Sequence, residues 1–340
     1  MNTRAADPHP APRLEVLPRD LRAYRRGNVG IDYVHRFDSG RPGPHVLINA
    51  LTHGNEFCGM VAACDLLDQQ VRPLKGTLTV SFANVEAYES FDAQDPFKSR
   101  QIDHNLNRVW SREWLEGPVD SVELRRAREL RPVVAAADHI LDIHSTSQDV
   151  VPFWVYPHFA RNEAVACALP LPDVHLVMPK GLGSGCPVIQ HGRHGEPDSD
   201  AGAALVVECG QHFLQASADR AVRVARAFLA HFGLIEQDSD RPSGTESRGS
   251  SGAATLAHHR RFELLRTHVV QHENFRFVRP LKGFEAFSQG EVIGHDGDEP
   301  IIAPCEDCTV FMPARVPIVG REGVYLTRPI SPLGPDSPHR

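Results

Sequence analysis

The sequence predicts an α/β fold, in which a mixed, largely parallel sheet is flanked by helices and followed by a smaller C-terminal all-β domain. Two observations indicate this fold class. Between residues 45 and 84, a continuous apolar run, a segment with helical spacing and a second apolar run follow one another, which is the β-α-β pattern of a parallel sheet. From 262 to 330, short alternating segments are separated by glycines, which is typical of an all-β unit.

The expected elements can be justified in chain order. The strands are apolar or alternating runs bounded by turn residues, and the helices have apolar residues at a spacing of three and four. We expect strands over 31–37, 45–52, 77–84, 139–143 and 203–207, and helices over 57–70, 122–137 (capped by Asp120 or Ser121 and kinked at Pro132) and 218–232. The polar stretch 86–117 is too long for an idle connection, and such loops are more often functional.

Composition shifts along the chain predict the domain boundaries. The start is rich in Pro and Arg, whereas one internal stretch contains almost no apolar residues. We expect an N-terminal arm (1–25), a catalytic α/β domain (26–235), a flexible linker or loop (236–254), a C-terminal β-rich domain (255–330) and a tail (331–340).

Charge and composition exclude several classes of partner. The chain has 340 residues, a formal net charge of −7 and 41% hydrophobic residues, which are ordinary values for a globular protein. An acidic chain without a basic run is not expected to bind nucleic acid. The sequence has no apolar stretch long enough to cross a membrane and no secretory signal at its start, so we expect a cytoplasmic protein. Base rates favour a homodimer.

Cysteine usage agrees with a reducing compartment. Seven cysteines are scattered through the chain, which is an odd number and not a disulfide framework. Cys305 and Cys308 form a C-x-x-C that is either a structural zinc site or, as we favour, a pair of small residues in a turn.

Polar residues at strand ends carry the predicted chemistry. His53 and Glu56 lie where a buried strand gives way to a helix, at the edge of the sheet where open α/β sheets bind ligands. They form either one face of a metal site or a structural His beside a capping Glu. His144 ends a second buried strand, and two histidines with one carboxylate are a ligand set of catalytic zinc hydrolases. The alternative for His144 is a core histidine.

A third strand end places Glu208 directly after three aliphatic residues. A buried carboxylate needs a partner, which is either a water bound to the metal or an arginine. In the polar loop, Arg100 and Arg108 flank Asn107, and an arginine fork beside an amide matches carboxylates and developing oxyanions. Solvated surface arginines are the alternative.

Four short motifs in this order resemble those of the succinylglutamate desuccinylase/aspartoacylase family, relatives of the zinc carboxypeptidases. The motifs are His53-Gly-Asn-Glu56, Asn105-Leu-Asn107-Arg108, Leu141-Asp-Ile-His144 and Val207-Glu208-Cys-Gly, and the resemblance extends over about 45–330. It implies one Zn²⁺ per chain bound by His53, Glu56 and His144, with Glu208 as general base and then general acid. It also implies that Arg100 polarises the scissile carbonyl and that Asn107 and Arg108 hold the substrate's α-carboxylate.

The sequence departs from the family in its acyl-group pocket. Family members place a substrate-binding arginine shortly before the catalytic glutamate, whereas the nearest upstream arginine here is Arg193, fifteen residues away. The family also brings a tyrosine from the C-terminal domain to the site, and Tyr325 is the candidate, with a core strand aromatic as the alternative. Three further histidines are expected outside the ligand set and remain reserve ligands: His191, His194 and His212.

The expected function is a zinc-dependent deacylase that cleaves the amide bond of a small, carboxylate-bearing N-acyl amino acid or a related amide. Two alternatives remain open. A zinc carboxypeptidase acting on short peptides would use the same metal and the same carboxylate clamp. A non-catalytic binding protein on the same fold would not need a buried base at Glu208.

Overall fold

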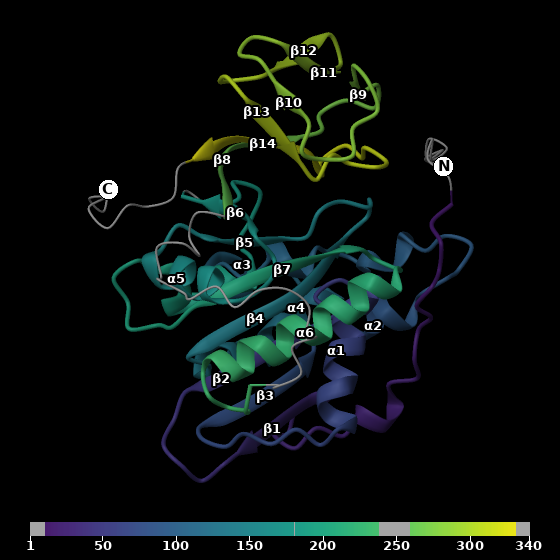
Figure 1. Ribbon diagram of the computed structural model, residues 1–340. Coiled ribbons are helices and arrows are strands. Elements are labelled where there is room, and N and C mark those ends of the chain that lie inside the picture. Colours follow the sequence, from purple (N-terminus) through teal and green to yellow (C-terminus); the bar gives the residue numbers. More distant parts are fainter. Residues whose placement is uncertain (1–10, 180, 238–258, 331–340) are drawn as a thin grey trace.

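A mixed sheet forms the frame of the protein in the computed structural model, which describes residues 11–179, 181–237 and 259–330 (Figure 1). Among the described residues this sheet has 11 strands, in the order β1-β3-β2-β4-β7-β5-β6-β8-β14-β13-β10. In chain order, these strands are β1 (Val34–Asp38), β2 (His45–Ala50), β3 (Thr77–Phe82), β4 (His139–Thr146), β5 (Phe153–Pro157), β6 (Val174–Met178), β7 (Ala204–Gln211), β8 (Arg260–Val269), β10 (Ala286–Phe287), β13 (Cys308–Phe311) and β14 (Glu322–Ile330).

The centre of the sheet is parallel. Strands β3, β2, β4 and β7 run in the same direction, whereas β1 pairs antiparallel with β3 and β5 pairs antiparallel with β7. Their near-continuous apolar composition fits burial on both faces. Because the strands are parallel, the carboxyl ends of β2, β4 and β7 meet at one edge. The predicted fold class, a mixed and largely parallel sheet flanked by helices, is confirmed.

Helices cover both faces of this sheet. Helices α1 (Phe57–Asp68) and α6 (Gln215–His231) pack on one face, and α4 (Val122–Ala136) packs on the other. The hydroxyl of Ser121 caps α4 by accepting a hydrogen bond from the amide of Leu124 at 3.2 Å. Helix α4 continues through Pro132, so the expected kink does not end it.

A strand-rich region follows and lies at the top of Figure 1. Strand β8 pairs parallel with β6 and antiparallel with β14, so the large sheet continues into this region without a break. A second, three-stranded sheet is formed by β9 (Arg276–Phe277), β11 (Val292–Asp296) and β12 (Glu299–Ile302). The region has its own apolar core, which includes Val270, Phe287 and Leu326. The predicted C-terminal strand-rich unit is present, and its exact limits stay a prediction.

Several elements differ from the expectation. Strands β5 and β6 and the helix between them, α5 (Ala160–Ala168), lie in a stretch with no predicted element. The polar stretch 86–117 contains short helices, among them α2 (Val85–Glu89) and α3 (Arg112–Glu116), and a 3-10 turn at Leu106–Arg108. Within the expected arm, Val16, Leu21 and Tyr24 are buried. The first ten residues of that arm, residues 238–254 of the expected linker and the tail lie outside the described residues.

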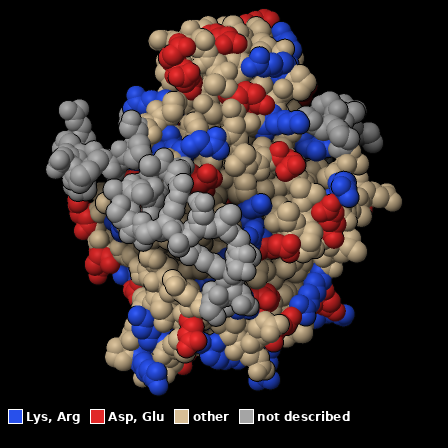
Figure 2. Space-filling view, in the orientation of Figure 1, with Lys and Arg blue, Asp and Glu red and all other residues tan. Residues whose placement is uncertain are grey.

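On the face of the molecule seen in Figure 2, basic and acidic side chains are interspersed, and neither kind dominates the surface. None of the described helices combines the length and apolar character needed to cross a membrane. All seven cysteines are free thiols.

Candidate active site

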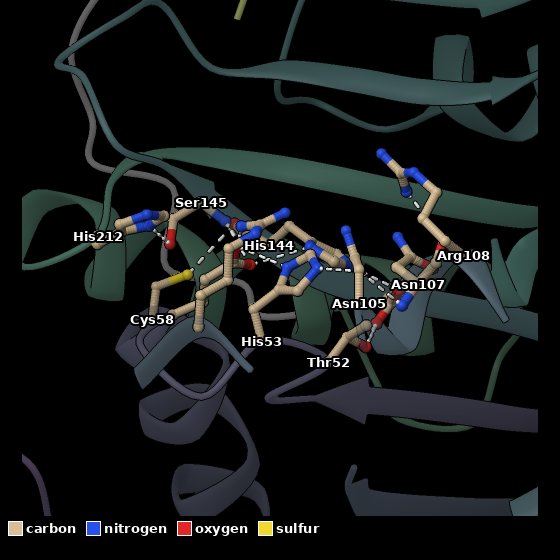
Figure 3. A network of polar contacts seen from close by, with 12 residues as sticks. Thr52, His53, Cys58, Asn105, Asn107, Arg108, His144, Ser145 and His212 are labelled. Atoms are coloured by element: carbon tan, nitrogen blue, oxygen red, sulfur yellow. Dashed lines mark hydrogen bonds and ion pairs between the residues drawn. The ribbon is translucent and has the colours of Figure 1, made fainter. Parts of the chain in front are cut away.

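Three buried side chains converge at the carboxyl edge of the sheet, and two of them, His53 and His144, are labelled in Figure 3. Ligand atoms of His53, Glu56 and His144 all lie within 4.8 Å of one another. Nδ1 of His53 is 2.8 Å from Oε1 of Glu56, and Nδ1 of His144 is 2.9 Å from Oε2 of the same carboxylate. The structure thus brings together the three residues that the motifs predict as metal ligands.

The chain path explains why these residues meet. His53 and Glu56 lie in the turn between β2 and α1, and a Cβ atom at Gly54 would be 2.4 Å from the carbonyl oxygen of Ser99. Only glycine therefore permits the close approach of the polar loop to this turn. His144 lies at the end of β4, which pairs with both β2 and β7.

Outer partners fix the orientation of both histidines. Nε2 of His144 is 2.6 Å from Oδ2 of Asp142, which lies two residues earlier on the same face of β4. Nε2 of His53 is 2.9 Å from Oδ1 of Asn105. Both rings therefore turn Nδ1 toward Glu56, and such outer carboxylate and amide partners are typical of histidines that bind metal.

The charged groups in and around this cluster shift the pKa values of its three residues. Burial lowers the pKa of His144, but the carboxylates of Asp142 and Glu56 outweigh burial and hold that pKa well above its usual range. The histidines in turn hold the pKa of Glu56 well below its usual range despite burial. Burial and the charge of Arg100 lower the pKa of His53 to about 4. A cation at Glu56 would displace the proton of His144, since a metal ligand must be deprotonated.

Glu208 faces the same site from the neighbouring strand. It is in register with His144 across β4 and β7, and its side chain is buried. Its Oε2 atom has no hydrogen-bond partner among the described residues. Burial, with smaller contributions from the carboxylates of Glu56 and Asp142, raises the pKa of Glu208 to about 8. A buried carboxyl group of this kind is suited to exchange protons near neutral pH.

Arginines from the polar loop reach the site. Nη1 of Arg100 donates to Oε1 of Glu56 at 3.1 Å, and about a third of the Arg100 side chain is exposed to the pocket. Arg108 is held more tightly: it donates through Nε to Glu322 at 2.6 Å and through Nη2 to the hydroxyl of Tyr325 at 2.9 Å. Two of its five N–H groups bond these residues and a third bonds the carbonyl of Asn107, so among the described residues two N–H groups remain for a ligand.

A cavity of about 220 Å³ lies above these groups. The α/β part of the chain contributes Glu56 from the turn before α1, Arg100 and Arg108 from the polar loop and Glu208 from β7 to its wall. The strand-rich region contributes Lys282, residues 312–316, Ile318, Arg321, Glu322 and Tyr325. The strand-rich region therefore covers the pocket, and cationic side chains come from both sides.

The comparisons with known proteins agree with this geometry. Residues 42–184 match the model of the succinylglutamate desuccinylase/aspartoacylase catalytic domain. The segment 42–184 of this chain belongs to that family. A succinylglutamate desuccinylase of Vibrio campbellii is 25% identical over 343 residues, which cover 93% of this chain and 89% of the relative. One from Vibrio cholerae serotype O1 is 36% identical over 67 residues, only 20% of its length.

The fold is shared over most of the chain. The crystal structure of the succinylglutamate desuccinylase from Vibrio parahaemolyticus superposes with a TM-score of 0.63 at 16% identity, covering 88% of this chain and 87% of that one. Identity at this level shows the fold alone. The family predicted from the four motifs is confirmed.

The other candidate residues take different places in this desuccinylase/aspartoacylase-like domain. Asn107 is buried beneath Arg108, and its amide oxygen accepts a hydrogen bond from the amide of Val188 at 3.0 Å. Tyr325 lines the pocket. Arg193 instead binds the carbonyl of Ala137 at 2.8 Å and the carboxylate of Asp138 at 3.0 Å, outside the pocket-lining set.

The three reserve histidines lie in different environments. His191 and His194 bond backbone carbonyls of Trp110 and Ala137 outside the pocket lining, whereas His212 lines the pocket. Nδ1 of His212 is 2.8 Å from the hydroxyl of Ser145, and burial lowers the pKa of His212 to about 3, which keeps the ring neutral (Figure 3).

Glu322 lines the pocket but is not among the site residues predicted from the sequence. Its carboxylate accepts from Arg108 and from the hydroxyl of Ser184 at 2.8 Å, and the Arg108 charge outweighs burial to lower its pKa to about 2. Glu322 is three residues before Tyr325, a spacing that places two residues of a regular strand on opposite faces. An irregularity in the pairing of β14 with β8 between Glu322 and Val324 brings both to the pocket. The nearness of Glu322 to Tyr325 in the sequence is the one feature that could have indicated its place in the site.

Proposed function

We propose that this protein is a zinc-dependent amide hydrolase that removes the acyl group from a small, carboxylate-bearing N-acyl amino acid. The observation that carries the proposal is the convergence of His53, Glu56 and His144 beneath a cavity that Glu208 also lines. The family of the catalytic domain supports hydrolysis of an amide.

The residues present fit a zinc ion. Two imidazole nitrogens and a carboxylate are the donor set of catalytic zinc sites, which leave a position open for water or substrate. Both histidines turn Nδ1 toward the carboxylate while Nε2 bonds an outer partner. His53, Glu56 and His144 would hold the metal, one ion per chain. When bound, zinc supplies Lewis-acid activation of water and of the substrate carbonyl.

The roles of the remaining residues follow from their positions. Glu208 takes the proton of the attacking water on its unpartnered Oε2 and passes it to the leaving nitrogen. Arg100 donates to the carbonyl oxygen as negative charge develops there. Arg108 offers to the substrate carboxylate the two N–H groups that no described residue bonds, while Glu322, Tyr325 and Asn107 hold its guanidinium in place.

The cover over the pocket favours small substrates. Residues of the strand-rich region line one side of a cavity of about 220 Å³, which limits the size of a bound ligand. The cationic groups Lys282, Arg315 and Arg321 lie on that side, so an anionic substrate fits the pocket although the whole chain is acidic. A carboxypeptidase acting on longer peptides would need this side to be open.

The proposal is tested by metal analysis and a substrate screen. The purified, zinc-loaded protein is assayed for released amine with N-acetyl, N-succinyl, N-formyl and longer N-acyl amino acids, with a tripeptide for comparison. We expect turnover of at least one N-acyl amino acid, and we expect His53→Ala to lose turnover together with the metal ion of this site. Tripeptide cleavage at a matching rate would favour a carboxypeptidase, and binding without turnover would favour a non-catalytic protein.

A further inference from the structure

A second cluster of metal-ligating side chains lies outside the active-site pocket. Ligand atoms of Cys167, His175 and His259 all lie within 4.8 Å of one another. They come from three segments: Cys167 from α5, His175 from β6, and His259 from the residue before β8. None of the three belongs to the lining of the cavity described above.

The nitrogen atoms of this cluster are already close together. Nε2 of His175 is 2.7 Å from Nδ1 of His259. On its other side, Nδ1 of His175 is 2.8 Å from the hydroxyl of Tyr156. His175 therefore has an outer partner on one nitrogen and turns the other toward the cluster, as the two histidines of the active site do.

Burial prepares the cluster for a metal ion. Cys167 and His175 are buried, and burial lowers the pKa of His175 to about 3, so that its ring is neutral at physiological pH. Burial raises the pKa of the Cys167 thiol to about 11. A bound cation would therefore displace the thiol proton to solvent and bind the thiolate.

The neighbouring charges compensate each other. The guanidinium of Arg261, two residues after His259, pairs with the carboxylate of Glu163 at 2.7 Å between Nη2 and Oε1. Both side chains are largely buried. The arginine charge is thus balanced by a carboxylate, and the thiolate of Cys167 would offset part of a divalent charge.

We propose that Cys167, His175 and His259 form a structural site for a divalent transition-metal ion of the zinc type. One thiolate and two imidazoles are borderline-soft ligands that favour zinc over magnesium or calcium. The site joins α5 to β6 and to the start of β8. Strand β8 pairs with β14, which carries Glu322 and Tyr325, so the metal fixes the point where the chain enters the cover of the active site.

The two clusters can be separated by cobalt spectroscopy, because only the second contains a thiolate. The full-length chain is freed of metal, loaded with Co²⁺ or Zn²⁺ and dialysed against metal-free buffer. We expect about two metal ions per chain in the wild type and about one in either His53→Ala or Cys167→Ser. A near-ultraviolet thiolate-to-cobalt charge-transfer band is expected in the wild type and His53→Ala, and is lost in Cys167→Ser.

Two controls keep the test decisive. Cys64→Ser removes another buried helical thiol and is expected to retain both metals and the charge-transfer band. His259→Gln changes a less buried ligand and is expected to lose the band even where Cys167→Ser does not fold. One metal per chain without a band in the wild type, or a band that survives Cys167→Ser, overturns the proposal. Neither result bears on the active-site metal, which His53→Ala reports independently.

Discussion

The two histidine clusters differ in what surrounds them. The cluster of His53, Glu56 and His144 lies beside a cavity that also holds Glu208 and Arg100. The cluster of Cys167, His175 and His259 lies under α5, outside that cavity. A catalytic metal site keeps a position open for water or substrate, and a neighbouring cavity gives access to it. We call the first the open cluster and the second the closed cluster, because only the first adjoins this cavity. The ligand types alone do not separate the two roles, whereas access and a neighbouring acid–base group do.

The sharpest test of this difference is Glu208→Gln. The substitution keeps the size of the side chain but removes the group that accepts and returns a proton, so we expect kcat to fall by about 10²–10⁴-fold. Metal content is expected to be unchanged, because Glu208 is not in the ligand set. Released amine and metal stoichiometry are measured together. Full activity in this variant would remove the feature that makes the open cluster catalytic.

Arg100→Met tests the proposed contact of Arg100 with the substrate carbonyl. Loss of a donor to the developing oxyanion is expected to lower kcat by about 10²–10³-fold, with a smaller change in KM. The matched control is Arg112→Met, an exposed arginine on α3 paired with Glu116, for which steady-state kinetics are expected to be unchanged. A change confined to KM in Arg100→Met would assign this residue to binding alone.

Glu322→Gln tests the ion pair between Glu322 of the strand-rich region and Arg108 of the polar loop. Removing the charged partner of Arg108 is expected to lower the free energy of unfolding by about 2 kcal/mol near neutral pH, measured by urea denaturation. Glu116→Gln, an exposed carboxylate, is the control and should have little effect.

The effect of Glu322→Gln should depend on pH. Since Arg108 lowers the pKa of Glu322 from 4.5 to about 2, its stabilisation is fully present above 4.5 and is lost as the pH falls toward 2. The free energies of unfolding of the wild type and of Glu322→Gln are therefore expected to differ by a constant amount above pH 4.5 and to converge below pH 4.5. A difference that does not depend on pH would mean that packing, and not charge, makes the contribution.

The smallest effect on kcat is expected for a substitution in the closed cluster. Cys167→Ser should keep kcat within about twofold of the wild type, since none of its ligands lines the cavity. Its thermal unfolding temperature in the presence of zinc should fall, whereas the same measurement in a strong chelator should show little difference. A large loss of kcat with unchanged stability would place this cluster in the catalytic machinery and end the distinction between the two.

Local sequence patterns predict the parallel centre of the fold and most of the open site. Strands 45–52, 139–143 and 203–207 were predicted from apolar runs, and a polar residue directly after such a run can only lie at the carboxyl edge of a parallel sheet. For that reason the sequence predicts that His53, His144 and Glu208 lie close together. The elements missed, β5, α5 and β6, lie beyond the parallel centre, where β5 reverses direction.

The strand-rich cover of the pocket and the closed cluster instead depend on contacts between distant parts of the chain. Glu322 reaches Arg108 across 214 positions of the chain, and the irregular pairing of β14 sets its face. Cys167, His175 and His259 come from a helix, a strand and a connection with no common sequence pattern. Local periodicity reports which face a residue occupies within one element. The pairing of β6 with β8, on which both features depend, is a long-range contact that no local pattern encodes.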